Sequence, residues 1–184
     1  PEGLRDALGT SGFYGLDVLQ YMRTPTGGFV DTNDTRELAV CAFATHDTPT
    51  VAGFFAAEDA RIRHAFGGID ADTLEQTRTD RKRAEDTLCD SDPVAQIHRN
   101  LAQANANMVA IQLDDIAARI SQQNLPGTVD SYPNWRLKAP FALSDIDTSA
   151  ACAQLAKDMA AQGRANPKGL EKENDLSDCS DKAH

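Results

Sequence analysis

The chain has 184 residues, a formal net charge of −10 and an apolar fraction of 41%. Such an acidic chain is a poor partner for duplex DNA, RNA or an anionic membrane, because a phosphate-binding face needs clustered cations. The apolar fraction can form a hydrophobic core, so wholesale disorder is not expected. The longest apolar run, Leu38 to Ala44, has seven residues. A bilayer span needs ~20.

The first part of the chain alternates helical and extended patterns. Pro1–Gly9 has proline in its first turn and a glycine stop, so it is predicted to be a helix. Gly15–Tyr21 is short and bounded by turn residues, which indicates a strand. Thr24–Thr35 is rich in Pro, Gly, Asn and Asp and is predicted to be a loop. Glu37–Ala44 is nearly continuous in apolar residues, as in a strand buried on both faces of a parallel sheet.

The segment from Val51 to Ala106 is predicted to be helical. Asp72 is expected to cap one helix and Asp92, followed by proline, to open another. The charged stretch Arg78–Asp86 is interpreted as a solvated helix face. Asn107–Leu113 is the third predicted strand, and a short helix over 116–120 should follow it.

The remaining sequence is predicted to hold a loop, a helix and a tail. Asn124–Lys138 is a loop that carries the only tryptophan, and Asp145–Gln162 is amphipathic. Residues 164–184 are polar and charged and are expected to be disordered. Strands separated by helices indicate an α/β fold with a parallel sheet. Three strands cannot close a barrel, so either sequence outside the chain completes the sheet or the fold is weak.

The start of the chain and its cysteines bear on its origin. The length alone predicts about one domain. Because the chain starts at Pro1 without an initiator methionine or a signal-peptide pattern, we expect it to be a piece of a longer protein.

The four cysteines (Cys41, Cys89, Cys152 and Cys179) are scattered, which favours free thiols and a cytoplasmic location. No spacing typical of zinc ligands occurs, so neither a structural metal nor a cofactor is predicted.

The most informative polar segment is Thr45–Thr50, which contains His46 and Asp47. It follows a predicted core strand and precedes a helix, where parallel α/β proteins place active-site residues. The alternative is that Thr45 or Asp47 only caps the following helix. Position alone favours the two interpretations about equally, and both can hold.

Two further segments are weaker candidates. Within Asn124–Arg136, amide, aromatic and cationic groups could bind a sugar, since amides bind hydroxyls and aromatic faces stack on C–H surfaces. For Trp135 alone, a buried structural anchor is favoured over a binding role. The acidic pair Asp114 and Asp115 follows the third strand and is interpreted as structural, as an exposed acid pair at a helix start.

Several of these motifs together resemble the 4-α-glucanotransferases of glycoside hydrolase family 77, the amylomaltases or disproportionating enzymes. THDTPTVAGFF after ELAVCAFA resembles their T-H-D-x-x-T strand end, and NLPGTVDSYPNWRLK resembles their N-x-P-G-T…N-W-R segment. PEGLRDALGTSGFYGLDVLQY is similar to the helix and strand after their catalytic acid/base, and MVAIQLDD is similar to their final barrel strand. The motifs occur in the family's order and cover about residues 1–162.

The resemblance implies the C-terminal part of a (β/α)8 barrel, with the predicted strands as its sixth, seventh and eighth. It implies transfer of an α-1,4-glucan segment from a maltodextrin donor to the 4-hydroxyl of glucose or another maltodextrin, by a retaining mechanism without a cofactor. Asp47 matches the stabiliser of the transition state, and His46 matches a histidine that binds the same sugar. Asn124, Pro126 and Gly127 match a loop on the acceptor side.

The sequence departs from the family pattern in one respect. The nucleophile and the acid/base of the family lie before the stretch that matches Pro1, so no residue here takes either role and the chain alone should be inactive. A non-catalytic α-glucan-binding module is the alternative interpretation. A helical interaction protein is disfavoured, because it would need neither the strand-end His46–Asp47 pair nor the Asn124 loop.

Overall fold

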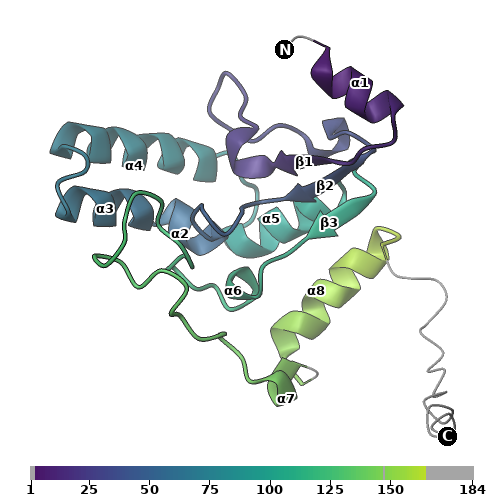
Figure 1. Cartoon of the computed structure of the whole chain (residues 1–184). Coiled ribbons are helices and arrows are strands. Elements are labelled where there is room, and N and C mark those ends of the chain that lie inside the picture. The colour runs from purple at the N-terminus through teal and green to yellow at the C-terminus, as the bar shows by residue number, and fades with distance from the viewer. Residues whose placement is uncertain (1–2, 147, 165–184) are drawn as a thin grey trace, which may run out of the picture.

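The computed structural model describes residues 3–146 and 148–164, and a three-stranded parallel sheet lies at its centre (Figure 1). The strands are β1 (Gly15–Val18), β2 (Ala39–Ala42) and β3 (Met108–Ala110), in the spatial order β1-β2-β3. The helices are α1 (Leu4–Thr10), α2 (Val51–Phe55), α3 (Glu58–Ala65), α4 (Ala71–Glu85), α5 (Pro93–Ala102), α6 (Leu113–Ile116), α7 (Leu143–Ile146) and α8 (Ala150–Ala161), with 3₁₀ turns η1 (Leu19–Tyr21) and η2 (Thr32–Asp34). The predicted parallel α/β arrangement is confirmed.

Each strand is shorter than the sequence predicts. The segment expected to be extended over Gly15–Tyr21 turns into η1 after Val18. The Met22 N–H closes this turn by donating to the Leu19 carbonyl oxygen at 2.9 Å, and the Gln20 N–H donates to the Phe43 carbonyl oxygen at 3.2 Å. At the end of β3, the last predicted strand residue, Leu113, begins α6, so the helix predicted over 116–120 starts earlier and ends at Ile116.

Helix boundaries differ from the predictions where another residue makes the cap. Asp70, rather than Asp72, caps α4, because its carboxylate accepts the Thr73 N–H at 2.8 Å. Asp92 caps α5 as predicted. The helix predicted over 145–162 is two helices, and α8 starts after Ser149, whose hydroxyl accepts the Cys152 N–H.

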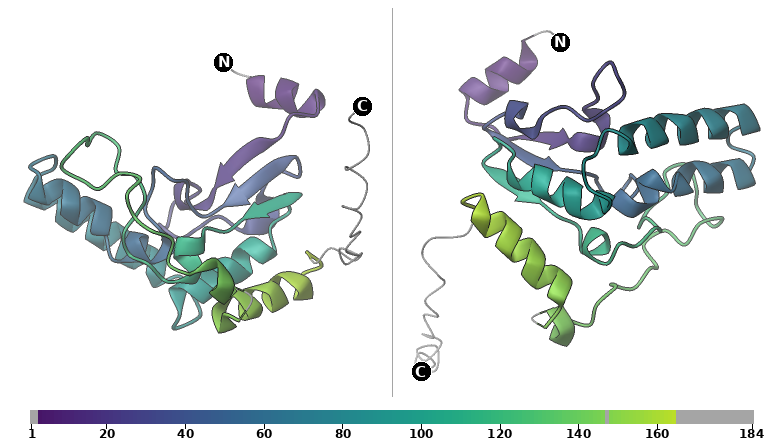
Figure 2. Two further views of the ribbon diagram at one scale, coloured as in Figure 1. Left: turned by 60° about the horizontal axis from the view of Figure 1, so that its bottom comes forward. Right: turned by 180° about the vertical axis from the view of Figure 1, so that it is seen from behind.

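The two faces of the sheet differ in burial. Ala39 and Cys41 of β2 are fully buried, on the face against which the helices pack. Val40, which lies between them, points to the opposite face, because side chains alternate along a strand. There the register aligns Leu16, Val40 and Met108, and Leu16 and Met108 are 56% and 45% exposed. Figure 2 shows α5 and α8 on one side of the sheet, with no described helix over the other side.

The hydrophobic core lies between the sheet and α2, α4 and α5. Phe43, just past β2, is 1% exposed and packs its ring edge-on against Phe54 of α2, with centroids 5.4 Å apart. Phe29 from the loop after β1 adds a third ring, 5.8 Å from Phe43. Ile97 and Leu101, one turn apart on α5, are also buried. This core fixes the end of β2 against the start of α2.

The C-terminal part of the described chain is joined to the core by Arg164. Its guanidinium donates to the carbonyl oxygens of Ala102 and Ala106 at 2.6 and 3.0 Å. Arg164 is the only residue of the expected 164–184 tail that the structure describes, and the rest of that tail lies outside the described residues. Within the part of the chain that is described, no helix has the length and apolar character to cross a membrane.

The aromatic core should dominate stability. We expect Phe43→Ala to lower the free energy of unfolding by about 3–5 kcal/mol, because it removes a buried ring and leaves a cavity. Phe13→Ala is the matched control, since Phe13 is 61% exposed, and should change it by less than about 0.5 kcal/mol. Urea unfolding followed by circular dichroism measures both, and equal losses would contradict this description of the core.

Candidate functional site

The segment after β2 folds back on itself and directs two polar side chains to the surface. The Thr48 hydroxyl oxygen accepts the Thr45 N–H at 2.8 Å and the Gln20 side-chain N–H at 2.7 Å. Thr48 and Gln20 are buried by this arrangement. The side chains of His46 and Asp47, between the two threonines, remain 60% and 46% exposed.

The helix cap predicted at Thr45 or Asp47 is made by a different residue. The Thr50 hydroxyl oxygen accepts the Gly53 N–H at 3.0 Å and so caps α2. The capping prediction is therefore wrong for both residues. Asp47 has its carboxylate free for contacts outside the helix.

Asp47 is joined to a segment 77 residues further along the chain. The Asn124 side-chain N–H donates to Asp47 Oδ1 at 2.6 Å, and His46 Nε2 lies 3.3 Å from Asp47 Oδ2. The His46 ring lies against the Trp135 ring, with centroids 5.1 Å apart and an interplanar angle of 43°. The structure thus brings together four polar or aromatic side chains that the sequence places in two segments.

Trp135 is not a buried anchor, and that interpretation is wrong. Its side chain is 62% exposed, and its backbone is left-handed with φ of 60°. The anchors of the loop are instead Leu125 and Tyr132, which are 0% and 6% exposed. The Trp135 side chain lies on the outer surface instead. The Trp135 backbone N–H donates to the Gln123 carbonyl oxygen at 2.9 Å.

The loop that carries Asn124 is closed by its own amide groups. The Asn134 Oδ1 accepts the Leu125 N–H at 2.8 Å, and its Nδ2 donates to the Thr128 carbonyl oxygen at 3.0 Å. Pro126 and Gly127 form the exposed turn between these contacts. The Pro126 carbonyl oxygen accepts a hydrogen bond from Arg63 of α3 at 3.2 Å, so this turn contacts α3 while Asn124 contacts Asp47.

The acidic pair at α6 is buried, contrary to the expectation of exposed acids. Asp115 is 2% exposed, and its Oδ1 accepts the Val51 N–H of α2 at 2.7 Å. Asp114 is 6% exposed, lies 3.1 Å from Arg119 Nη1 and accepts the Gln123 side-chain N–H at 2.8 Å. Their role is structural, as predicted, but it consists of holding the 119–124 segment against α2.

Gly53 allows this segment to lie directly on α2. A Cβ at Gly53 would fall inside the contact distance of the Ile120 carbonyl oxygen. The neighbouring Thr50 hydroxyl donates to the Arg119 carbonyl oxygen. Sequence reasoning missed Gly53 and Gln20, and although it singled out the Thr45–Thr50 segment it did not identify Thr50 as the cap of α2. The available signal was a glycine inside an otherwise apolar helix. Glycine lowers helix stability, so its presence there indicates that a neighbouring segment packs closely against the helix.

Burial raises the pKa of two groups, Asp115 and Cys41. Desolvation raises the pKa of Asp115 to about 6, against a smaller opposite effect of the Val51 hydrogen bond. Desolvation also raises the pKa of the Cys41 thiol to about 11, so it is not a reactive thiolate at neutral pH. Cys41, Cys89 and Cys152 are free thiols. No group of three His, Cys, Asp or Glu within residues 3–146 and 148–164 is arranged to hold a metal ion.

Taken together, the structure is that of an α/β protein with a parallel sheet, and its candidate site groups a carboxylate, an imidazole and an amide at the end of the central strand. The chain belongs to the 4-alpha-glucanotransferase family, glycoside hydrolase family 77, whose model matches residues 1–144.

Individual relatives agree with this assignment. The chain is 30% identical to 4-alpha-glucanotransferases of Mycobacterium bovis and Mycobacterium tuberculosis, over 84% of this chain and 25% of theirs. It is 25% identical to that of Haemophilus influenzae. An amylomaltase structure from Corynebacterium glutamicum matches with a TM-score of 0.70 and 22% identity, covering 86% of this chain and 27% of that one. The chain therefore spans about a quarter of the length of the relatives that it matches.

The raised pKa of Asp115 predicts a pH effect on stability. A folded-state pKa near 6 against an ordinary value of 3.8 means that folding favours the protonated acid. The contribution of Asp115 to the free energy of unfolding is therefore most favourable below pH ~4 and is lost as the pH rises through the folded-state pKa of about 6. Asp115→Asn keeps the acceptor for Val51 and removes the ionisation, so we expect the variant to be about 1–3 kcal/mol more stable than the parent at pH 7.

Chemical denaturation at pH 4 and pH 7 measures this difference. The advantage of Asp115→Asn should shrink towards pH 4. Asp130→Asn, at an exposed position of the nearby loop, should show no such change. An Asp115→Asn variant less stable than the parent at pH 7 would show that the ionised carboxylate is needed.

Proposed function

We propose that this chain is the C-terminal part of a 4-α-glucanotransferase barrel, which transfers α-1,4-glucan segments to the 4-hydroxyl of glucose or another maltodextrin. The observation that carries the proposal is the Asp47 carboxylate, bound by Asn124 and next to His46 just past β2, in a chain of this family. The donor is a maltodextrin or longer α-1,4-glucan.

The exposed face of the sheet supports the proposal of a (β/α)8 barrel. Both β1 and β3 are edge strands, and the apolar residues Leu16, Val40 and Met108 are aligned across the face that no described helix covers. In a closed barrel, strands on either side would pair with the two edges, and this face would be turned to the filled interior. The described strands would then be the sixth, seventh and eighth.

Asp47 is assigned the role of stabilising the transition state. Its Oδ1 is held by Asn124 and its Oδ2 faces His46, so the carboxylate has a fixed position before substrate binds. Glycosyl transfer passes through a ring with positive, oxocarbenium-like character. A preorganised carboxylate binds that ring, and the hydroxyls of a flattened sugar, more strongly than the ground state.

The remaining site residues are assigned to sugar binding. His46 and Asn124 offer N–H groups beside Asp47 that can bind sugar hydroxyls. The exposed Trp135 ring offers an aromatic face for the C–H side of a sugar. Pro126 and Gly127 form the turn of the same loop, on the acceptor side of the site.

The chemical step needs two more carboxylates than Asp47. A retaining enzyme uses a nucleophile and a general acid/base ~5 Å apart across the scissile bond. The family resemblance places both upstream of the stretch that begins at Pro1, so the chain alone should catalyse no transfer.

The free thiols of Cys41, Cys89 and Cys152 support a cytoplasmic location, where thiols stay reduced.

The second candidate is a non-catalytic α-glucan-binding module. The observation in its favour is Trp135, an exposed aromatic ring beside hydrogen-bonding groups, which by itself suits binding rather than bond cleavage. The two functions differ in the role of Asp47. Removing its charge would greatly slow transfer in the enzyme, whereas a binding module would release no glucose in any variant.

We predict that the protein extended upstream disproportionates maltotriose to glucose and longer maltodextrins, and that Asp47→Asn lowers this rate by about 10²–10³-fold, as loss of a transition-state contact does. The amide keeps the size of the side chain, and Asp130→Asn, at an exposed loop position, should retain the rate. Chromatography of the products measures both. Full activity of Asp47→Asn would remove Asp47 from the mechanism, and glucan binding without glucose release by the extended parent would favour the binding module.

A further inference from the structure

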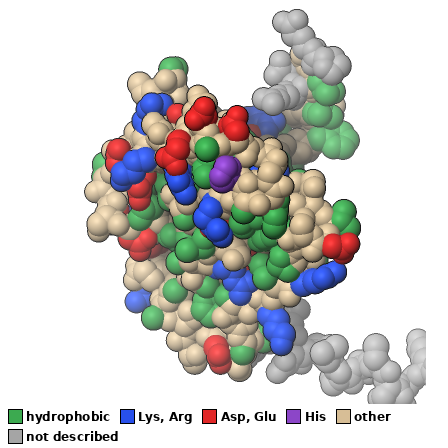
Figure 3. All heavy atoms as spheres, turned by 90° about the vertical axis from the view of Figure 1, so that its left-hand side faces the viewer, with side chains coloured by type: hydrophobic (Ala, Val, Ile, Leu, Met, Phe, Trp, Pro, Cys, Tyr) green, Lys and Arg blue, Asp and Glu red, His purple; other side chains and the backbone are tan. Residues whose placement is uncertain are grey.

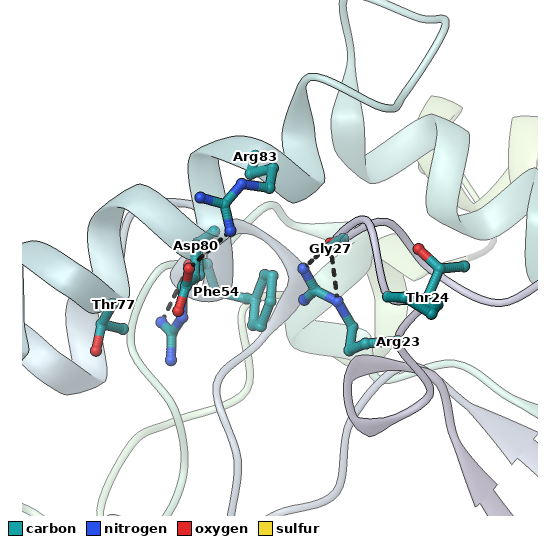
Figure 4. Close-up of a pocket in the computed structure, with 9 residues that line it drawn as sticks. Arg23, Thr24, Gly27, Phe54, Thr77, Asp80 and Arg83 are labelled. Atoms are coloured by element: carbon teal, nitrogen blue, oxygen red, sulfur yellow. Dashed lines mark hydrogen bonds and ion pairs between the residues drawn. The ribbon is translucent and has the colours of Figure 1, made fainter.

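A cavity of about 410 Å³, separate from the Asp47 group, opens between the turn after η1 and α4. Phe54 of α2 forms part of its wall, Arg23 projects from the turn after η1, and Arg83 projects from α4 (Figure 4). Its volume is within the range of small-molecule sites. None of its lining residues belongs to the candidate glucan site.

The lining carries an excess of positive charge. Three arginines, Arg23, Arg81 and Arg83, line the cavity together with a single carboxylate residue, Asp80. The chain as a whole has 18 Lys and Arg against 28 Asp and Glu, so this local balance is opposite to that of the molecule. On the surface of the molecule that Figure 3 shows, cationic and acidic side chains are interspersed.

Two of the three arginines have carboxylate partners. Arg81 is bound by Asp59 of α3, with Nη2 3.0 Å from Oδ2, and both side chains are largely buried. Arg83 is 3.1 Å from Asp80, and that pair is more than half exposed. An exposed pair on one helix has little stability, so Arg83 can exchange Asp80 for another anion.

Arg23 has no carboxylate partner among the described residues. Its Nε donates to the carbonyl oxygens of Gly27 and Gly28 at 3.1 and 3.2 Å, and its Nη2 also donates to the Gly27 carbonyl oxygen. The Phe29 ring centroid lies 4.6 Å from the guanidinium carbon. Its Nη1 has no hydrogen-bond partner in the described part of the chain. Burial lowers the pKa of Arg23, although the group stays charged. The guanidinium is therefore fixed in place with its charge unneutralised by direct contact.

We propose that this cavity binds a phosphoryl group, as free phosphate or as the phosphate ester of a sugar, with Arg23 as its main ligand and Arg83 as the second. Arg23 can donate to a phosphate oxygen from Nη1, the nitrogen left without a partner, and Arg83 can donate from a guanidinium held only by an exposed carboxylate. Two guanidinium groups at one cavity suit a dianion. The hydroxyl-bearing residues Thr24 and Thr77 and the Phe54 ring complete a lining suited to a sugar body. Asp80 opposes the anion and sets the strength of binding. This site is independent of the proposed function.

Calorimetric titration of the full chain with inorganic phosphate and with glucose 6-phosphate tests the proposal, with glucose as the neutral control. We expect saturable binding of at least one phosphate compound, weakening as salt is added, and none of glucose. Tighter binding of glucose 6-phosphate would identify a sugar phosphate as the ligand class, and equal binding would identify free phosphate. Absence of saturable binding by either compound would overturn the proposal.

Substitutions give the sharper arm of the test. Arg23→Gln should weaken binding about tenfold or more, because a charge-assisted contact is lost. Asp80→Asn should tighten binding about fivefold, because it removes the opposing charge at constant size. A damaged fold cannot produce tighter binding. Arg78→Gln is the matched control on α4, exposed and paired with Glu75, and should change nothing. Unchanged or weaker binding by Asp80→Asn would overturn the proposal.

Discussion

The close contact between the first turn of α2 and the backbone at 119–120 is the constraint on which the candidate site depends. Gly53 permits it, since any side chain there would meet the Ile120 carbonyl oxygen. Thr50 reinforces it by bonding to the Arg119 carbonyl oxygen, and Asp115 reinforces it by accepting the Val51 N–H. The last bond buries a carboxylate, whose raised pKa reflects the cost of that burial.

This contact explains how a surface carboxylate acquires a fixed position. Asp47 follows β2 directly, but Asn124 reaches it only because the 119–124 segment is held on α2. The segment also supports the Trp135 loop, since the Gln123 carbonyl oxygen accepts the Trp135 N–H. Preorganisation of this kind is what a transition-state stabiliser needs, because a carboxylate that had to reorient during the reaction would contribute less. The structural contact and the proposed chemistry are therefore two aspects of one arrangement.

Much of the architecture could be predicted from local patterns, whereas the contacts between distant segments could not. The apolar run at β2 and the proline after Asp92 are local signals, and they correctly predicted a buried strand and a helix start. The Asp47–Asn124 bond joins residues 77 positions apart, so no local pattern contains it. The buried anchor that the sequence favours for Trp135 is wrong, because its backbone is left-handed and its side chain lies on the surface. Asp114 and Asp115 fit an exposed acid pair at a helix start by sequence, but contacts with Arg119 and with the Val51 N–H hold them in the interior.

The most direct test is a crystal structure of the Gly53→Ala variant, compared with Gly9→Ala, whose added Cβ would meet no atom within 4 Å. If the contact at Gly53 positions the site, the added methyl group pushes the 119–120 backbone away from α2. The separation between Asn124 Nδ2 and Asp47 Oδ1 then increases beyond hydrogen-bond range, whereas Gly9→Ala keeps it at 2.6 Å. A Gly53→Ala structure that retains the Asp47–Asn124 hydrogen bond with α2 in place would contradict the account.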